Sequence, residues 1–350
     1  MEKYSKKVGV IYMRKLIVSL LCLIVLFSIV EIRRNVNAQQ LPIEPKGKYG
    51  YRGYSLSYII TPIYDEAKPF SENLAPVAIK NADGLMKWGF IDVKGNIVIP
   101  LEYDYADRFF DGMAYVEKEG EKGFISKSNS FIKMNLKSGV NSLQFQNGYL
   151  QIKGDKNIVF IDKKGNKNTF SVKNKEVLFA LSENVFVARD NSKNKIGLIN
   201  KKGEWLSKRF YDSIRGVPND GYLALIIDNA KVYIDKNGNE IFKVKNEKTQ
   251  YGYYDSFDGR SGLLKIVDKG TGLYGYVNKE FKQVIPCNIQ KVVHPFVDTS
   301  ATIFLQNNEE FVVIDTTGKI KSRISKTFFD DKYYKVVPVF INGLWLFREN

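Results

Sequence analysis

Cysteine and histidine are almost absent from this sequence. Its 350 residues include two Cys and one His, which is too few for a disulfide framework or for a metal site built from Cys and His. We therefore expect no metal and no cofactor. Amphipathic helical periodicity is also missing after residue 38, which leaves β-strands as the expected elements.

A single long apolar stretch is present, at residues 16–30. It carries no charge and follows five basic residues, a pattern typical of an export signal. As a helix, it would extend ~22 Å, less than the ~30 Å hydrocarbon layer of a membrane. Residues 1–38 are thus a signal peptide cleaved after Ala38 or, alternatively, an uncleaved membrane anchor. Either way, we expect the remainder to be extracytoplasmic: secreted, periplasmic or at the cell surface.

Basic residues exceed acidic residues, with 53 Lys and Arg against 38 Asp and Glu and a formal net charge of +15. A basic balance can reflect nucleic-acid binding, but no RNA- or DNA-binding motif accompanies it here. We expect no nucleic-acid partner. The expected partner is therefore an unknown protein or an anionic component of the cell envelope.

After a linker at residues 39–48, residues 49–350 repeat with a period near 38. An aromatic-aliphatic or aliphatic pair recurs at intervals of 34 to 43 residues. Its copies are Phe90-Ile91, Phe124-Ile125, Phe160-Ile161, Leu198-Ile199, Tyr233-Ile234, Tyr276-Val277 and Val313-Ile314. A second landmark, a residue tolerant of left-handed backbone before an apolar run, recurs at Asn73, Gly112, Gly148, Asn184, Gly221, Gly262, Ser300 and Gly343. Together they indicate eight tandem units.

Each unit is expected to contain three short strands. In the clearest unit the first is Gly89-Phe90-Ile91-Asp92, which ends at a turn with Gly95. The second is Ile97-Val98-Ile99, with Pro100 as its predicted end because proline cannot donate to a ladder. The third is the apolar run after the second landmark.

These motifs resemble the WG-repeat family of bacterial tandem repeats, named for a pair seen here at Trp88-Gly89. The Phe-Ile-Asp strand, the Ile-Pro pair and Tyr103-Asp104 complete the match in that unit. Tyr49-Gly50, Ile196-Gly197 and Tyr274-Gly275 replace Trp-Gly elsewhere. The resemblance covers nearly all of residues 49–348. It implies a β-repeat scaffold in proteins that are often exported, and no catalytic residues.

The predicted fold is all-β, an eight-bladed β-propeller-like ring, with an open β-solenoid as the alternative. Closure favours the propeller because it removes the two exposed sheet ends that a soluble protein must otherwise protect.

Isolated reactive side chains are interpreted as structural. His294 occupies a repeat position where another unit has Lys68, and Cys287 has no neighbouring base. The Asp residues that follow Tyr recur in several units, so we expect them to bond backbone amides in turns rather than to form catalytic pairs. They are Asp65, Asp104, Asp212 and Asp255. Asp330-Asp331, in the less regular last unit, is the alternative to a purely structural role for the acids, as a site for a cation.

Two features are candidate binding sites. The segment Tyr251-Gly252-Tyr253-Tyr254 lengthens its unit and is predicted to be a binding loop. Lysines at the tip of the first hairpin in five units are predicted to form a basic rim; they are Lys94, Lys164, Lys202, Lys236 and Lys279. The function that follows is a non-catalytic binding scaffold at the envelope. A propeller-type enzyme and a carbohydrate-binding module are the alternatives.

Overall fold

The computed structural model of the chain describes the repeat domain and leaves the amino-terminal segment out. The described residues are 47–55, 57–134, 144–153, 158–170, 173–219, 221–244, 249–258, 261–297, 299–305, 310–325 and 343–348. The predicted signal or anchor at residues 1–38 and the acids Asp330-Asp331 lie outside them. No helix of the described residues is long and apolar enough to cross a membrane.

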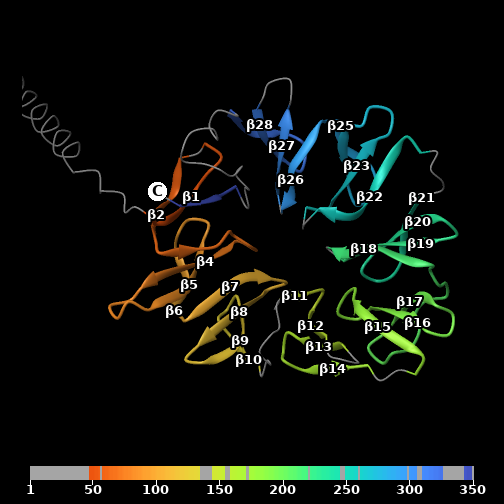
Figure 1. Cartoon of the computed structure of the whole chain (residues 1–350), viewed down its shortest axis with the longest axis horizontal. Helices are drawn as coiled ribbons and strands as arrows, with labels where there is room; N and C mark the ends of the chain where they lie inside the picture. Colours follow the sequence, from red (N-terminus) through yellow and green to blue (C-terminus); the bar gives the residue numbers. More distant parts are fainter. Residues whose placement is uncertain are drawn as a thin grey trace, which may run out of the picture. The chain divides into compact units, whose positions relative to one another are not determined.

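The described residues form eight separate antiparallel sheets, arranged around a ring (Figure 1). The first sheet has the order β2 (Tyr58–Tyr64), β1 (Tyr49–Arg52) and β30 (Trp345–Arg348). The next three are β3 (Glu66–Ala67), β4 (Leu74–Lys80), β5 (Met86–Asp92) and β6 (Ile97–Tyr103); β7 (Tyr105–Phe110), β8 (Met113–Lys118), β9 (Glu121–Ser126) and β10 (Phe131–Lys133); and β11 (Phe145–Gln146), β12 (Tyr149–Lys153), β13 (Ile158–Asp162) and β14 (Lys167–Thr169).

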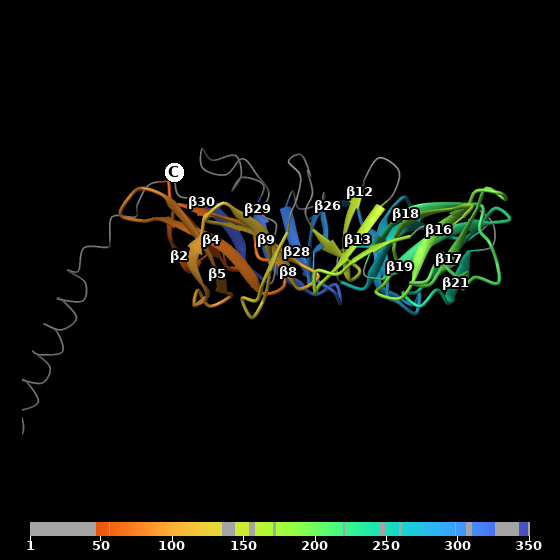
Figure 2. The same ribbon diagram turned by 90° about the horizontal axis from the view of Figure 1, so that it is seen from below.

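The remaining four sheets follow the same plan. They are β15 (Lys175–Ala180), β16 (Phe186–Asp190) and β17 (Lys195–Ile199); β18 (Ser213–Asn219), β19 (Tyr222–Ile227), β20 (Ala230–Ile234) and β21 (Glu240–Val244); β22 (Tyr251–Asp258), β23 (Leu263–Asp268), β24 (Tyr274–Val277) and β25 (Gln283–Ile289); and β26 (Lys291–Val297), β27 (Ser300–Leu305), β28 (Glu310–Asp315) and β29 (Ile320–Ser325). The first strand of a sheet lies nearest the centre, as β7, β18 and β26 show in Figure 1. Seen edge on, the sheets stand side by side in one tier (Figure 2).

The two ends of the repeat domain meet in one sheet. β1 pairs with β30 in a continuous antiparallel register from Tyr49 opposite Arg348 to Arg52 opposite Trp345. An open solenoid would leave both ends unpaired, whereas here the last strand completes the sheet that the first strand begins. The propeller prediction is confirmed, and the solenoid alternative is wrong.

The expected grouping of strands is wrong in one respect. Six of the eight sheets have four strands, and the innermost strand of each was not predicted. In addition, the predicted third strand of one unit pairs with the predicted first strand of the next, as β4 does with β5. A predicted unit therefore contributes to two neighbouring sheets, which ties consecutive sheets together covalently.

The core lies between neighbouring sheets. The aligned aromatic residue of one sheet packs against a ring from the next, at 4.9 Å between the centroids of Phe90 and Phe109 and 5.0 Å between those of Phe124 and Phe145. Further pairs of this kind are Tyr51 with Phe70, Phe160 with Phe186, and Tyr276 with Phe296. These aligned rings are at most 1% exposed, as the shared register predicted, and tilted ring pairs add to the stabilisation from burial.

The glycine of the Trp-Gly pair is required by the strand beside it. A Cβ at Gly89 would lie 2.5 Å from the carbonyl oxygen of Ile99 and 2.6 Å from that of Pro100. The pairing of β5 with β6 shifts register there, so the outer strand bulges toward the glycine. Gly50 and Gly275 face equivalent carbonyls, at 2.6 Å in both cases.

The prediction that Pro100 ends its strand is wrong. β6 continues through it to Tyr103, and β2 and β25 likewise run through Pro62 and Pro286. These are the outermost strands of their sheets, where a residue without an N–H leaves no partner unsatisfied.

Candidate functional site

The turns between the strands divide the ring into two faces. In an antiparallel sheet, the turn after the first strand and the turn after the third strand lie at the same end. We call the face that carries these two sets of turns the turn face. The opposite face carries the turns between second and third strands and the connections from one sheet to the next.

The turn after the third strand has one local structure in six of the sheets. The side chain of Asp92 accepts hydrogen bonds from the N–H groups of Lys94 and Asn96, both at 2.9 Å, and Gly95 has a φ of 90°. The same pattern recurs at Asp162, Asn200, Asp235, Asn278 and Asp315. Hydrogen bonds from Asn96 hold the pKa of Asp92 below its usual range. These carboxylates and amides therefore fix the loop and project the residue two positions later.

The five lysines of the predicted basic rim occupy this turn. Lys94, Lys164, Lys202 and Lys236 are exposed, and Lys279 is half-buried, with its Nζ 5.1 Å from the centroid of Tyr222. The structure thus brings all five to the turn face, each in a different sheet. Their role in binding stays a prediction.

Neighbouring sheets are joined on the turn face by a recurring contact that we call the acid bridge. Both carboxylate oxygens of Glu72 accept the N–H of Gly112, at 3.2 and 3.0 Å, and Lys127 lies 3.1 Å from the same carboxylate. One sheet further on, Asp111 takes the place of Glu72. It accepts the N–H of Gly148 at 2.5 Å.

Lys163 completes this second bridge, with its Nζ 2.8 Å from Asp111. In both copies the acid comes from the first turn of one sheet, whereas the glycine and the lysine come from the next. A main-chain N–H and an ammonium group thereby bind one carboxylate.

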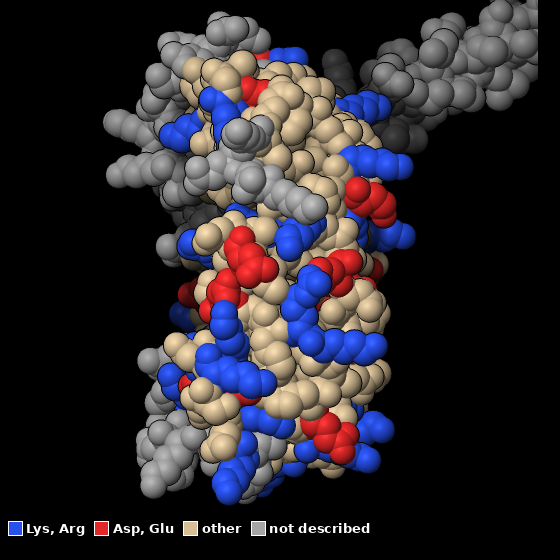
Figure 3. All heavy atoms as spheres, turned by 90° about the vertical axis from the view of Figure 1, so that its right-hand side faces the viewer, with Lys and Arg blue, Asp and Glu red and all other residues tan. Residues whose placement is uncertain are grey.

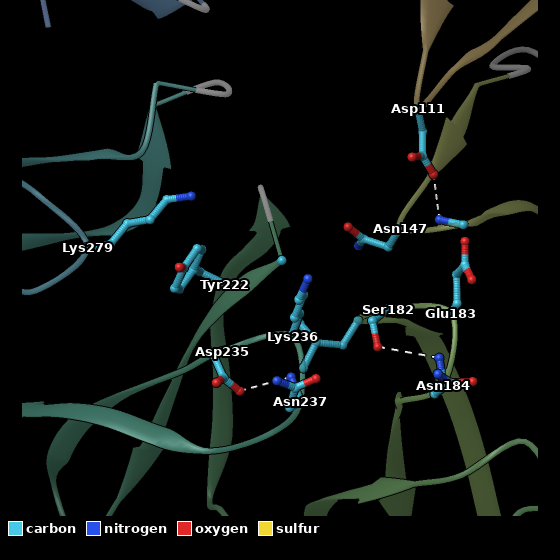
Figure 4. Close-up of a pocket in the computed structure, with 13 residues that line it drawn as sticks. Asp111, Asn147, Ser182, Glu183, Asn184, Tyr222, Asp235, Lys236, Asn237 and Lys279 are labelled. Carbon is cyan, nitrogen blue, oxygen red and sulfur yellow. Dashed lines mark hydrogen bonds between the residues drawn. The ribbon is translucent and has the colours of Figure 1, made fainter.

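A cavity of about 610 Å³ opens on the turn face. Its lining residues come from the turns of five consecutive sheets: Asp111, Asn147, Gly148, Leu181, Ser182, Glu183, Asn184, Gly221, Tyr222, Asp235, Lys236, Asn237 and Lys279. Figure 4 shows the side chains of Lys236 and Lys279 extending toward this space, with Glu183 and Asp111 on the other side. Two of the predicted rim lysines therefore line a cavity that also presents amides, a hydroxyl and carboxylates.

The outer wall of the ring carries charges of both signs on the side that Figure 3 shows. Figure 3 shows Lys and Arg interspersed with Asp and Glu across the part of the wall that faces the viewer. Exposed ion pairs of the ring include Lys133 with Glu121, across neighbouring strands, and Arg209 with Glu240, between neighbouring sheets. Such exposed pairs contribute little to stability.

The predicted binding loop is not a loop. Tyr251, Tyr253 and Tyr254 belong to β22, the innermost strand of its sheet. The ring of Tyr253 packs 5.3 Å from that of Phe242, and Tyr254 is 38% exposed, with the Nζ of Lys265 4.0 Å from its ring centroid. Binding by these tyrosines stays a prediction.

The recurring Asp residues after Tyr have structural partners, as expected. Asp104 accepts the N–H of Glu119 at 2.7 Å and pairs with Lys87 at 2.6 Å. Asp65 and Asp212 make equivalent contacts with Lys80 and Asp228 N–H groups and with lysines of the preceding sheet, and Asp255 pairs with Lys231. The accepted N–H groups lie at the turn after the second strand, not in the turn next to the Asp. These contacts hold neighbouring sheets together on the face opposite the turn face.

The other reactive side chains lie apart from the cavity. His294 is half-buried on β26. Cys287 is a free, half-buried thiol whose pKa is raised by burial, the opposite of an activated nucleophile. Within the described ranges, no cluster of three His, Cys, Asp or Glu side chains suits a metal ion.

Sequence reasoning missed Glu183, Ser182 and Asn147, which line the cavity. A signal was present, because a polar residue precedes the second landmark at Glu72, Asp111, Asn147 and Glu183. This repeat position supplies the acids of the acid bridge.

No curated protein sequence matches the chain. Among solved structures, a eukaryotic initiation factor is 10% identical and matches 79% of this chain and 95% of its own, with a TM-score of 0.36. Hsv2 from Kluyveromyces lactis is 10% identical over 74% of this chain and 98% of its own, with a TM-score of 0.34.

A virginiamycin B lyase from Staphylococcus aureus is 16% identical over 80% of this chain and 95% of its own, with a TM-score of 0.28. Likeness at this level supports no conclusion about a ligand or an activity. The family model described as WG containing repeat matches residues 57–81, 88–121, 196–230 and 274–308. The chain is therefore a β-propeller that carries WG-containing repeats in four regions.

Proposed function

We propose that this chain is a non-catalytic binding scaffold whose turn face takes an anionic component of the cell envelope. The observation that carries the proposal is the cavity of about 610 Å³ lined by Lys236 and Lys279, on the same face as the exposed tips of Lys94, Lys164 and Lys202. Ligand sites of proteins commonly have volumes in this range. Lysines repeated around one face attract an extended anion over a longer distance than a single charge does.

Binding suits the side chains of this face better than catalysis does. A general acid or base needs a pKa near the working pH, whereas backbone and side-chain hydrogen bonds hold the pKa of Asp235 below its usual range. Burial does raise the pKa of Asp258, but this residue lies at the end of β22 and does not line the cavity.

The place of action follows from residues 1–38. Their basic start and apolar run support export, with the propeller secreted, periplasmic or at the cell surface, or attached to a membrane through residues 16–30. Amino-terminal sequencing of the protein recovered from the envelope tests this. A mature end at Gln39 means cleavage, an intact end in the membrane fraction means an anchor, and recovery from the cytoplasm contradicts the proposal.

The binding experiment compares two charge-matched variants with the parent. The first changes the rim lysines to glutamine: Lys94, Lys164, Lys202, Lys236 and Lys279. The second changes five exposed lysines of the opposite face: Lys80, Lys153, Lys173, Lys193 and Lys269. Retention is measured on envelope fragments and on anionic phospholipid vesicles at ~20 mM salt, where the Debye length is about 20 Å.

Loss of retention in the first variant alone, with an unchanged melting temperature, supports the proposal. Equal loss in both variants would mean that net charge, and not the turn face, is responsible. If the parent is retained on neither surface, the proposed anionic partner is wrong.

A further inference from the structure

The acid bridge predicts a third copy between the fifth and sixth sheets. In the two copies that form among the described residues, the acids are Glu72 and Asp111, each one residue before the second landmark. Glu183 holds this position in the fifth sheet. Gly221 and Lys236 of the sixth sheet occupy the positions of Gly148 and Lys163, so these three residues have the chemistry of a complete bridge.

This third bridge does not form. The side chain of Glu183 lies over Gly148, where a Cβ would overlap its Cγ, and is thus turned back toward the fourth sheet. Within the part of the chain that the structure describes, no hydrogen bond or ion pair engages the Glu183 carboxylate, the Gly221 N–H or the Lys236 ammonium. All three residues line the cavity.

Gly221 and Lys236 are nevertheless arranged as a pair. A Cβ at Gly221 would lie 2.9 Å from the Cβ of Lys236, and Gly221 has a φ of 76°, close to the 79° of Gly112. The lysine stem therefore runs beside the glycine, with the two donors on one side of the cavity. In the preceding sheets the same two donors hold a carboxylate of this chain.

We propose that the Gly221 N–H and the Lys236 ammonium form a receptor for the carboxylate of a small ligand. The ligand's carboxylate takes the position that Glu72 and Asp111 fill in the other bridges. The remainder of the ligand lies in the cavity, where Ser182, Asn147 and Asn237 offer hydrogen bonds to polar groups. This inference rests on the proposed function and narrows its anion to a carboxylate.

Glu183 is the internal competitor of such a ligand. Turning its side chain from Gly148 toward Gly221 would complete the bridge and fill the receptor. In either orientation its negative charge lines the cavity and opposes an incoming anion. Removing that charge should therefore increase affinity, whereas removing Lys236 should decrease it.

The experiment uses the full chain and titrates four probes at ~20 mM salt, with binding followed by calorimetry. Acetyl-triglycine with a free carboxylate is compared with its carboxyl-terminal amide, and glucuronate with glucose, so that a peptide end is distinguished from a sugar acid. We expect at least one acid to bind and its neutral partner to bind at least tenfold more weakly, as for the loss of a hydrogen bond to a charged group.

Three variants locate the site. Lys236→Gln should weaken the acid at least fivefold, and Glu183→Gln should strengthen it about two- to fivefold. Lys202→Gln, which removes an exposed lysine from the equivalent turn of the neighbouring sheet but lines no part of the cavity, should leave affinity unchanged. Because no hydrogen bond or ion pair joins the Lys236 ammonium to another described residue, its replacement should leave the melting temperature unchanged.

The inference is overturned if neither acid binds at ~10 mM, if acid and neutral partner bind equally, or if Lys236→Gln and Lys202→Gln behave alike. Inorganic phosphate, titrated in parallel, must bind more weakly than the better acid, since otherwise the receptor is not one for carboxylates. Retention on envelope fragments separates the two proposals. If Lys236→Gln leaves carboxylate binding intact while the five-lysine variant loses retention, the proposed function stands and this inference fails.

Discussion

Replacing Gly89 with alanine tests whether the Trp-Gly pair is a steric requirement of the propeller. The new Cβ would lie 2.5 Å from the carbonyl oxygen of Ile99 and 2.7 Å from the carbonyl carbon of Pro100, both backbone atoms that no rotamer change can move. Ordinary contact starts near 3.4 Å, so β6 must shift outward by almost 1 Å. Overpacking of this kind typically costs 1–3 kcal/mol, and alanine recovers about 0.4–1 kcal/mol by restricting the unfolded chain.

We expect Gly89→Ala to lower the free energy of unfolding by about 1 kcal/mol, which is a decrease of about 2 °C in melting temperature for a chain of this size. Urea unfolding followed by circular dichroism measures it. Gly53→Ala is the control, because its Cβ would meet only the side chain of Ile59, at 3.1 Å, and that side chain is 50% exposed and free to move. Equal stability of the two variants would refute the steric explanation.

Three further predictions concern stability. A chain ending before Gly343 lacks β30 and leaves β1 paired only with β2. It should unfold at a lower temperature than the parent and be cut sooner by proteases near Tyr49. Unchanged resistance to proteolysis would mean that ring closure contributes nothing to stability. Asp104→Ala should lower the free energy of unfolding by about 1 kcal/mol because the N–H of Glu119 and the Lys87 ammonium lose their acceptor, whereas the same change at exposed Asp83 should have a smaller effect. Bonds to lysine side chains and backbone N–H groups lower the pKa values of Asp65 and Asp104. The contribution of these two carboxylates to folding stability is therefore complete above about pH 4 and is lost as pH falls below it. A melting temperature that stays constant from pH 5 to pH 2 would contradict this.

The repeat period, the buried rings and the turns after the third strand could be predicted from the sequence because each depends on local residues. Phe90 and Phe124 share a register in the repeat. Gly95 marks a turn because the left-handed backbone there favours glycine. The innermost strands were missed because segments such as Tyr105–Phe110 alternate poorly between apolar and polar residues. Pro100 was misread because a proline looks like a strand end unless the strand is known to be the outermost one.

The candidate site was harder to predict because it depends on a contact that fails to form. Lys236 could be placed on one face from its repeat position alone. That Glu183 turns away from it depends on side-chain orientation, which the repeat pattern does not encode. The substitution of Asn147 for an acid in the preceding unit was visible, but its meaning required the bridges at Glu72 and Asp111.

The pairing of β1 with β30 sets the order in which the chain can be completed. Residues 49–52 must wait for residues 345–348, so the first sheet cannot finish before nearly the whole polypeptide is available. Bringing together ends about 300 residues apart costs about 5 kcal/mol of chain entropy, and the intervening sheets offset most of it by stacking in sequence. During synthesis the ring therefore stays open until its last strand is available, so the sheet that closes it is the last one to be completed.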